Sequence, residues 1–139
     1  MRRVLVDVNV ILDVLLDRQP HVAASVAVWT AIESGEAEGL LAAHAITTIH
    51  YLVRKELGAA RARRTLSQIL RVFGVAPVDG AVIQDALKRV SPDFEDSVMI
   101  SAARIVGCDL IITRDPRGFR DSPVRVLTPE AAVPLLSSA

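Results

Sequence analysis

The sequence predicts an α/β protein in which helices cover both faces of a central parallel sheet. Short apolar runs typical of buried strands alternate with longer segments whose apolar residues recur at helical spacing. The chain has 139 residues, the size of one ordinary domain, and no low-complexity tract or internal repeat interrupts it. We therefore expect a single domain over residues 1–139, built as a three-layer α/β/α sandwich.

The first strand is expected at residues 3–6, a run of apolar side chains after an arginine. Residues 8–16 carry apolar side chains at helical spacing, with Asp13 available to face solvent. Pro20 suits the first turn of a second helix, whose body covers residues 22–32. These segments form the first β-to-α unit of the sheet.

The middle of the chain repeats this alternation. Residues 39–43 are a second strand candidate, and two helices follow at residues 46–57 and 59–72, separated by a glycine. A third strand is expected at residues 74–78, closed by a proline and an Asp-Gly turn. A further helix over residues 81–90 completes this part.

The last third contains two more strands. The Ser-Pro-Asp sequence at 91–93 opens a helix that continues to about residue 106. Residues 109–113 form the most apolar strand candidate, and residues 124–127 a shorter one. The Thr-Pro pair at 128–129 begins the final helix.

Bulk composition excludes several classes of protein. Sixteen basic and sixteen acidic residues cancel, so net charge does not attract the chain to nucleic acid. The single cysteine, Cys108, excludes an internal disulfide framework. No secretion signal or membrane-spanning apolar run is apparent, and a cytoplasmic protein without membrane contact is expected.

Acidic residues occur where strands are expected to end. Asp7 directly follows the first strand, and Asp115 follows the most apolar strand by two residues. Asp93, Glu95 and Asp96 lie at the start of a helix. Taken one at a time, each acid is explained as a helix cap, a dipole partner or a turn residue.

Taken together, the acids indicate a metal site. Ligands in parallel sheets bind beyond the carboxyl ends of the strands, where Asp7 and Asp115 are expected. Carboxylates gathered there would repel one another, and a divalent cation relieves that repulsion. Oxygen ligands suit Mg²⁺ or Mn²⁺, whose usual substrate in such a site is a phosphate ester. His44 and His50 lie six positions apart and are not expected to contribute.

Basic residues could contact the phosphates of such a substrate. Arg61, Arg63 and Arg64 belong to a strongly basic helix, and Arg114 and Arg117 flank Asp115. A solvated helix face explains the first three equally well.

The order of three motifs resembles that of the PIN domain family. They are VDVNVILD near the start, FEDSVMISAA at the later helix, and ITRDPRGF after the most apolar strand. The resemblance implies an α/β/α fold and Mg²⁺- or Mn²⁺-dependent cleavage of RNA. It also implies the toxin role in a toxin–antitoxin pair, with an antitoxin protein as partner. A homodimer is implied as well, for which the apolar second helix (Val22, Val26, Trp29) is the first candidate surface.

Carried onto this sequence, the family's catalytic and metal-binding acids fall on Asp7, Asp96 and Asp115, with Asn9 as the polar companion of Asp7. The hydroxyl of Thr113 could support the site from the neighbouring strand.

One position departs from the family pattern. The family commonly has a Glu in its third helix, and Thr48 stands at the matching place here. Glu95 or Asp93 could replace that acid. The departure leaves open a PIN-like module that binds RNA or a protein without cleaving. A phosphatase with Asp7 as nucleophile is a weaker alternative, because such enzymes usually have a second Asp where this chain has Asn9.

Overall fold

The computed structural model describes residues 1–137, and it confirms a central parallel sheet between two layers of helices. Positions 138–139 of the predicted domain lie outside the described residues. The strands are ordered β3-β2-β1-β4-β5, and every neighbouring pair is parallel. Their bounds are β1 Arg2–Val6, β2 Ala37–Ala42, β3 Gly74–Ala76, β4 Leu110–Ile112 and β5 Arg125–Leu127.

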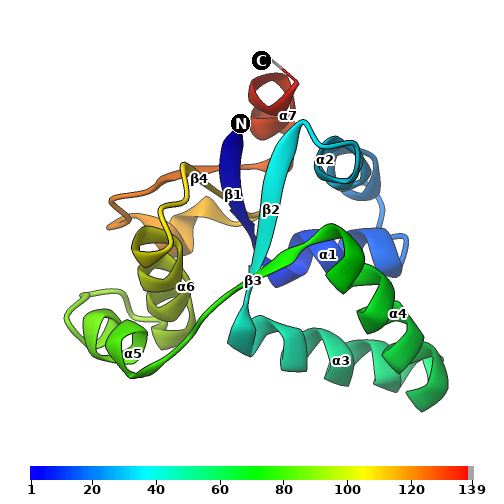
Figure 1. Ribbon diagram of the computed structural model, residues 1–139, viewed down its shortest axis with the longest axis horizontal. Helices are drawn as coiled ribbons and strands as arrows, with labels where there is room; N and C mark the ends of the chain where they lie inside the picture. The colour runs from blue at the N-terminus through cyan, green and yellow to red at the C-terminus, as the bar shows by residue number, and fades with distance from the viewer. Residues whose placement is uncertain (138–139) are drawn as a thin grey trace.

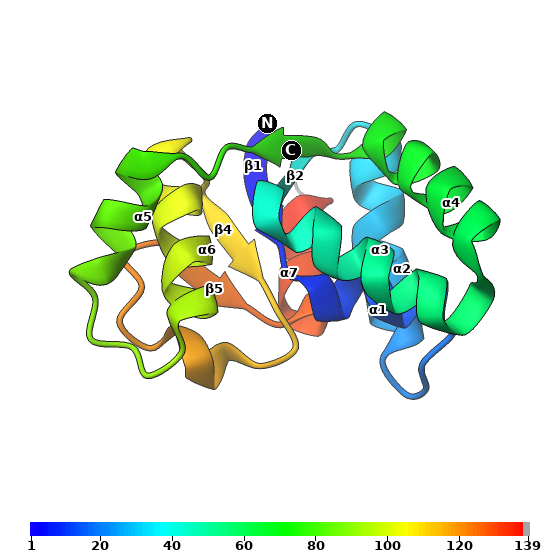
Figure 2. The same cartoon turned by 90° about the horizontal axis from the view of Figure 1, so that it is seen from below.

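Helices cover the sheet unequally. Figures 1 and 2 show one pair on one side, α5 (Gly80–Leu87) and α6 (Phe94–Ile105), which pack against each other. The other side carries α1 Val8–Leu15, α2 Val22–Glu33, α3 Ala43–Leu57, α4 Ala59–Val72 and α7 Pro129–Leu136. A short 3₁₀ helix, η1 (Pro116–Phe119), lies between β4 and β5.

The chain reverses its direction across the sheet between β1 and β4. From β1 it moves outward to β2 and then β3, and it returns through α5 and α6 to β4 on the other side of β1. As a result, β1 and β4 are hydrogen-bonded neighbours, and the chain leaves them in opposite directions across the sheet. Such a switch point opens a crevice beyond the strand ends, which is the usual place of a ligand site in this architecture.

Apolar side chains of the two central strands fill the core. Val4, Leu5 and Val6 of β1 and Ile111 and Ile112 of β4 are fully buried. Strands covered on both faces need apolar residues at every position, which is why these runs do not alternate. Among residues 1–137, no helix is both long enough and apolar enough to cross a bilayer.

Several boundaries differ from the sequence prediction. β3 ends at Ala76 rather than at residue 78, and α5 ends at Leu87 rather than at residue 90. Pro20 precedes α2, which begins at Val22 with His21 as its N-cap, so the proline is not in the first turn. The second strand ends at Ala42, and α3 begins immediately at Ala43 rather than at residue 46. Ala42 has an extended backbone and Ala43 is already helical, so no loop separates the two elements. The earlier start places His44 in the first turn of α3.

Candidate active site

The switch point places the ends of β1 and β4 side by side. Val6 is opposite Ile112 in the parallel register, and the amide of Asp7 donates to the Ile112 carbonyl at 2.9 Å. Asp7 is the N-cap of α1, and its Oδ1 accepts from the Val8 amide at 2.7 Å. The capping explanation is therefore correct, but it uses only one oxygen of the carboxylate.

The second oxygen of Asp7 faces β4. The Thr113 hydroxyl donates to Asp7 Oδ2 at 2.7 Å, and the same hydroxyl oxygen accepts from the Asp115 amide at 3.2 Å. Asn9 joins this network, because its Nδ2 donates to Thr113 Oγ1 at 3.4 Å and its Oδ1 accepts from the Arg114 amide at 3.3 Å. Asn9 and Thr113 thus hold the segment after β4 against the start of α1.

The start of α6 brings a second set of acids to the same edge. Asp93 is the N-cap of α6, where its Oδ1 accepts from the amides of Glu95 and Asp96 at 2.9 and 3.3 Å. The Asp96 carboxylate lies so close to the backbone of Gly118 in η1 that an added Cβ there would collide with Oδ2. A glycine in η1 is therefore needed for Asp96 to reach this position.

We call the group of carboxylates beyond the ends of β1 and β4 the acidic edge. Its members are Asp7, Asp93, Glu95, Asp96 and Asp115, and they act on one another electrostatically. Burial raises the pKa of Asp7 above its ordinary value, and the hydrogen bonds from Thr113 and Val8 offset this only in part. Burial, together with a smaller effect of four neighbouring negative charges, raises the pKa of Asp96 to about 7. These charges are those of Asp93, Asp7, Glu95 and Asp115. Negative charge is therefore gathered here, and the nearby arginines Arg114 and Arg117 do not prevent the rise in the pKa values of Asp7 and Asp96.

Asp115 is more exposed than the other two acids. Its side chain is 59% exposed and forms an ion pair of 3.1 Å with Nε of Arg117, whose side chain is 81% exposed. An exposed pair of this kind contributes little to stability, so either side chain can change partner at small cost.

The donors at this edge suit a divalent cation. Carboxylates, the Asn9 amide and the Thr113 hydroxyl are hard oxygen ligands of the kind that Mg²⁺ and Mn²⁺ bind. The raised pKa values of Asp7 and Asp96 show that added positive charge would be favourable here. As placed, no three His, Cys, Asp or Glu side chains among residues 1–137 converge on one point as ligands. Binding would therefore require side-chain rotation, for which Asp115 is the most free.

Asp13 was expected to face solvent and Arg114 to contact RNA, and the structure places both differently. Asp13 does not face solvent, because its side chain is fully buried. Nε of Arg114 lies 2.7 Å from Asp13 Oδ2 in an ion pair that lacks hydrogen-bond geometry, and the Ser25 hydroxyl donates to the same oxygen at 3.3 Å. The Arg114 guanidinium therefore anchors the segment after β4 to α1 and α2, which limits its availability to a substrate.

The other arginines predicted to contact RNA fall into two groups, one away from the acidic edge and one beside it. Arg61, Arg63 and Arg64 are exposed on α4, which packs against α3 and lies away from η1 (Figure 2). The structure does not bring this helix to the acidic edge. Arg117, on η1, does lie there.

α3 has no acid at the position where the PIN resemblance implies a Glu. Thr48 is partly buried on α3, and the helix has no acidic residue before Glu56. Glu95 of α6 instead lies near enough to raise the pKa of both Asp7 and Asp96. An acid near this site therefore comes from α6 rather than α3.

Sequence reasoning missed His44. Burial lowers the pKa of its ring, while the charges of Glu95 and Asp7 act in the opposite direction, so the imidazole lies in the field of the same acids. Both ring nitrogens are covered and have no hydrogen-bond partner within residues 1–137. His44 follows the end of β2 much as Asp7 follows β1. The strand predicted at residues 39–43 already places His44 directly after a strand end, so the rule that singles out Asp7 could have identified it.

The sequence matches the PIN domain family over residues 3–117. The chain belongs to the PIN domain family. This PIN domain is similar to a curated protein named ribonuclease VapC1 from Aquifex aeolicus (strain VF5), with 26% identity over 133 residues that cover 92% of this chain and 91% of the relative.

Solved structures share the fold of this PIN domain. A toxin–antitoxin complex from Klebsiella pneumoniae superposes with a TM-score of 0.69 at 18% identity, covering 91% of this chain and 97% of the other. VapC20 from Mycobacterium tuberculosis, described as a toxin that cleaves the sarcin–ricin loop, superposes with a TM-score of 0.68 at 14% identity, covering 85% and 94%.

Proposed function

We propose that this PIN domain is a divalent-metal-dependent endoribonuclease, the cytoplasmic toxin of a toxin–antitoxin pair. The observation that carries the proposal is that the charges of Asp7 and Asp115, which follow the paired strands β1 and β4, both act on the carboxylate of Asp96. Family membership and the similarity to a protein named as a ribonuclease support it. The similarity in fold to a toxin–antitoxin complex supports the toxin role and an antitoxin partner.

Asp7, Asp96 and Asp115 would hold Mg²⁺ or Mn²⁺. A bound ion supplies Lewis-acid stabilisation of a phosphodiester undergoing attack by water. The chain's own residues prepare that edge. Thr113 and Asn9 orient the Asp7 carboxylate and the segment that carries Asp115.

Glu95 supplies the additional acid in place of the helix-three Glu that Thr48 replaces. Its negative charge acts on both Asp7 and Asp96, as an acid in that role must. Asp93 acts mainly as the cap of α6 and supports Asp96 indirectly. Arg117 stands at the rim of the acidic edge and could contact a flanking phosphate when it leaves Asp115.

Cleavage of a structured RNA tests the proposal. The purified protein should cut the RNA with Mg²⁺, and EDTA or Asp7→Asn should abolish cutting. Equal cleavage under all three conditions would refute the assignment of Asp7.

A second candidate is a PIN domain that binds RNA or a protein without cleaving, which the absence of an acid on α3 before Glu56 favours. Titration with Mn²⁺ separates the two. A catalytic site should be stabilised against unfolding by Mn²⁺ in the wild type and much less in Asp96→Asn. No stabilisation and no turnover would favour the non-cleaving module.

A further inference from the structure

A cavity of about 520 Å³ opens beside the acidic edge. One wall is the connection between α5 and α6, with Val90, Ser91 and Pro92, and the other is η1 with Arg120 and Asp121 directly after it. Asp115 belongs both to this wall and to the proposed metal site. A ligand in the cavity would therefore be next to a group held at the acidic edge. The volume is within the range of pockets that take small ligands.

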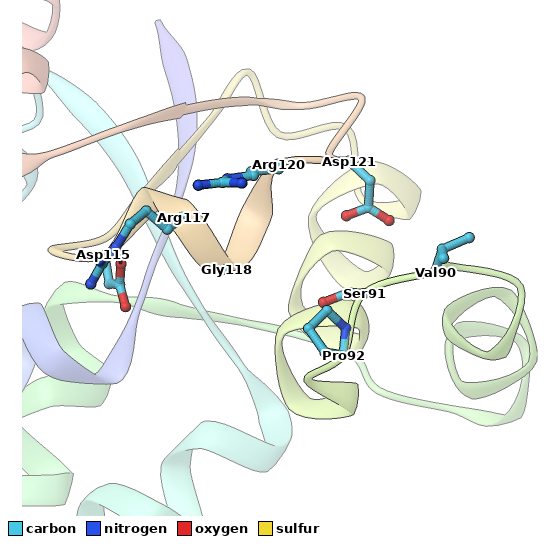
Figure 3. Close-up of a pocket in the computed structure, with 8 residues that line it drawn as sticks. All are labelled: Val90, Ser91, Pro92, Asp115, Arg117, Gly118, Arg120 and Asp121. Atoms are coloured by element: carbon cyan, nitrogen blue, oxygen red, sulfur yellow. Dashed lines mark hydrogen bonds and ion pairs between the residues drawn. The ribbon is translucent and has the colours of Figure 1, made fainter.

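The two walls of the cavity differ in chemistry. Val90 is 93% exposed and, with Pro92, offers an apolar surface. Opposite it, the Asp121 carboxylate points toward Ser91 and Pro92, while the Arg120 guanidinium extends along η1 toward Arg117 (Figure 3). The cavity thus presents an apolar surface, a cation and an anion to a ligand.

The two charged groups contributed by Arg120 and Asp121 are available to a ligand. Within residues 1–137, neither side chain forms an ion pair or a hydrogen bond. Both are exposed, so their positions are not explained by stabilisation of the fold. Arg117, the other arginine of this wall, is paired only with Asp115 in a solvent-exposed contact.

We propose that this cavity binds one nucleotide of the RNA, directly next to the phosphate that is cleaved. The assignment rests on the proposed function for its placement relative to the cut. The base packs its apolar face against the aliphatic side chains of Val90 and Pro92, which removes apolar surface from water. Arg120 contacts the phosphate of that nucleotide, and Asp121 accepts hydrogen bonds from the edge of the base.

The carboxylate of Asp121 selects among bases. A carboxylate has two acceptor oxygens side by side. Guanine presents two adjacent donors, N1–H and N2–H, that match them. Adenine and cytosine each have one exocyclic amine beside a ring acceptor, and uracil has one N–H between two carbonyl oxygens, so none of the three presents two adjacent donors. A guanine is therefore the preferred occupant, and paired hydrogen bonds of this kind give a preference on the order of tenfold or more.

Binding of mononucleotides tests the cavity without any need for catalysis. Guanosine, adenosine and uridine 5′-monophosphates are titrated into the ¹⁵N-labelled protein in EDTA. Guanosine monophosphate should bind about tenfold more tightly than the other two and shift the amides of Ser91, Gly118 and Asp121. Equal shifts for all three nucleotides, or none at these amides, would overturn the proposal.

Three variants assign the contacts. Asp121→Asn should remove the preference for guanosine monophosphate. Arg120→Ala should weaken the binding of all three nucleotides to a similar degree. Arg125→Ala is the matched control, because Arg125 is exposed, does not line the cavity, and lies at the amino end of β5, in register with Leu110 at the start of β4. It should leave binding unchanged. An unaltered preference in folded Asp121→Asn would contradict the assigned role.

Cleavage assays separate this inference from the proposed function. The substrate is an RNA with one guanosine, compared with the same RNA carrying inosine, which lacks the N2 amine. If Mg²⁺-dependent cleavage occurs but neither Arg120→Ala nor Asp121→Asn changes its rate or position, the cavity assignment fails and the nuclease proposal stands. If guanosine monophosphate binds as expected but no RNA is cut, the nuclease proposal fails and the nucleotide site stands.

Discussion

The hydroxyl of Thr113 donates a 2.7 Å hydrogen bond to Oδ2 of Asp7, joining residues that are 106 positions apart in the chain. Thr113 is fully buried at the end of β4, and Asp7 caps α1 at the end of β1. The bond therefore crosses the switch point of the sheet. It fixes the orientation of one carboxylate of the proposed metal site before any ligand arrives, which reduces the ordering that binding requires.

Thr113→Val tests this orienting role, because valine keeps the shape of the side chain and removes its donor. The change should weaken Mn²⁺ binding and RNA cleavage by about ten- to a hundredfold, since a hydrogen bond to a charged group contributes about 1.5–3 kcal/mol. Calorimetric titration with Mn²⁺ measures the effect. Thr113→Ser restores the hydroxyl and should recover most of the affinity. A valine variant with wild-type affinity would show that the bond does not orient Asp7.

Gly118→Ala tests the close approach of η1 to Asp96. The added Cβ would collide with the Asp96 carboxylate, so Asp96 must move and metal-dependent cleavage should fall at least tenfold. Gly80→Ala is the matched control, because a Cβ on Gly80 meets no atom within 4 Å. Circular dichroism confirms that both variants fold. Full activity in Gly118→Ala would place Asp96 outside the site.

Arg114→Ala and Arg117→Ala compare two ion pairs on one short segment. Removing Arg114 leaves the carboxylate of Asp13, which is 0% exposed, without its cation, and should lower the free energy of unfolding by about 3–5 kcal/mol. Removing Arg117 breaks only an exposed pair and should cost less than about 1 kcal/mol. Urea unfolding measures both. Similar losses in the two variants would contradict the anchoring role of Arg114.

The raised pKa of Asp96 predicts a pH-dependent stability. Its pKa is about 7 in the folded chain, compared with 3.8 ordinarily, so between these values the unfolded chain releases a proton that the folded chain retains. Without divalent metal, stability should fall as the pH rises through this interval and level off above it.

Urea unfolding in EDTA at pH 5 and pH 8 measures this decline, and Asp96→Asn should reduce it. Glu33→Gln is the control. Glu33 is the last residue of α2, shortly before the start of β2, and its replacement should leave the pH dependence of stability unchanged. An identical pH dependence in the wild type and Asp96→Asn would show that Asp96 is not in the acidic surroundings described.

The sequence was sufficient to predict the layers of this fold. Apolar runs such as that of β4 cannot be exposed, and their alternation with helices leaves few arrangements other than a parallel sheet covered on both faces. The boundaries were less certain where no capping side chain stops an element. Ala42 and Ala43 carry no signal that distinguishes strand from helix, so α3 was started three residues late.

The candidate site was predicted in part. Asp7 and Asp115 follow from the rule that strand ends meet at one edge, whereas Asn9 came from the family resemblance and Thr113 from its hydroxyl alone. The structure connects all four through hydrogen bonds. The burial of Asp13 could not be predicted, because its partner Arg114 lies about 100 positions away and helical spacing alone does not reveal it. His44 is different, because its place after a strand end was visible in the sequence, whereas the effect of Glu95 and Asp7 on its ring is seen only in the structure.

The most direct measurement is a crystal of the protein soaked in Mn²⁺ and examined at a wavelength where manganese scatters anomalously. We expect an anomalous peak beyond the ends of β1 and β4, about 2.1 Å from carboxylate oxygens of Asp7, Asp96 and Asp115. Arg117 should then have lost its partner Asp115. A peak at another part of the surface, or none at a saturating Mn²⁺ concentration, would contradict the proposal that these three carboxylates form one metal site.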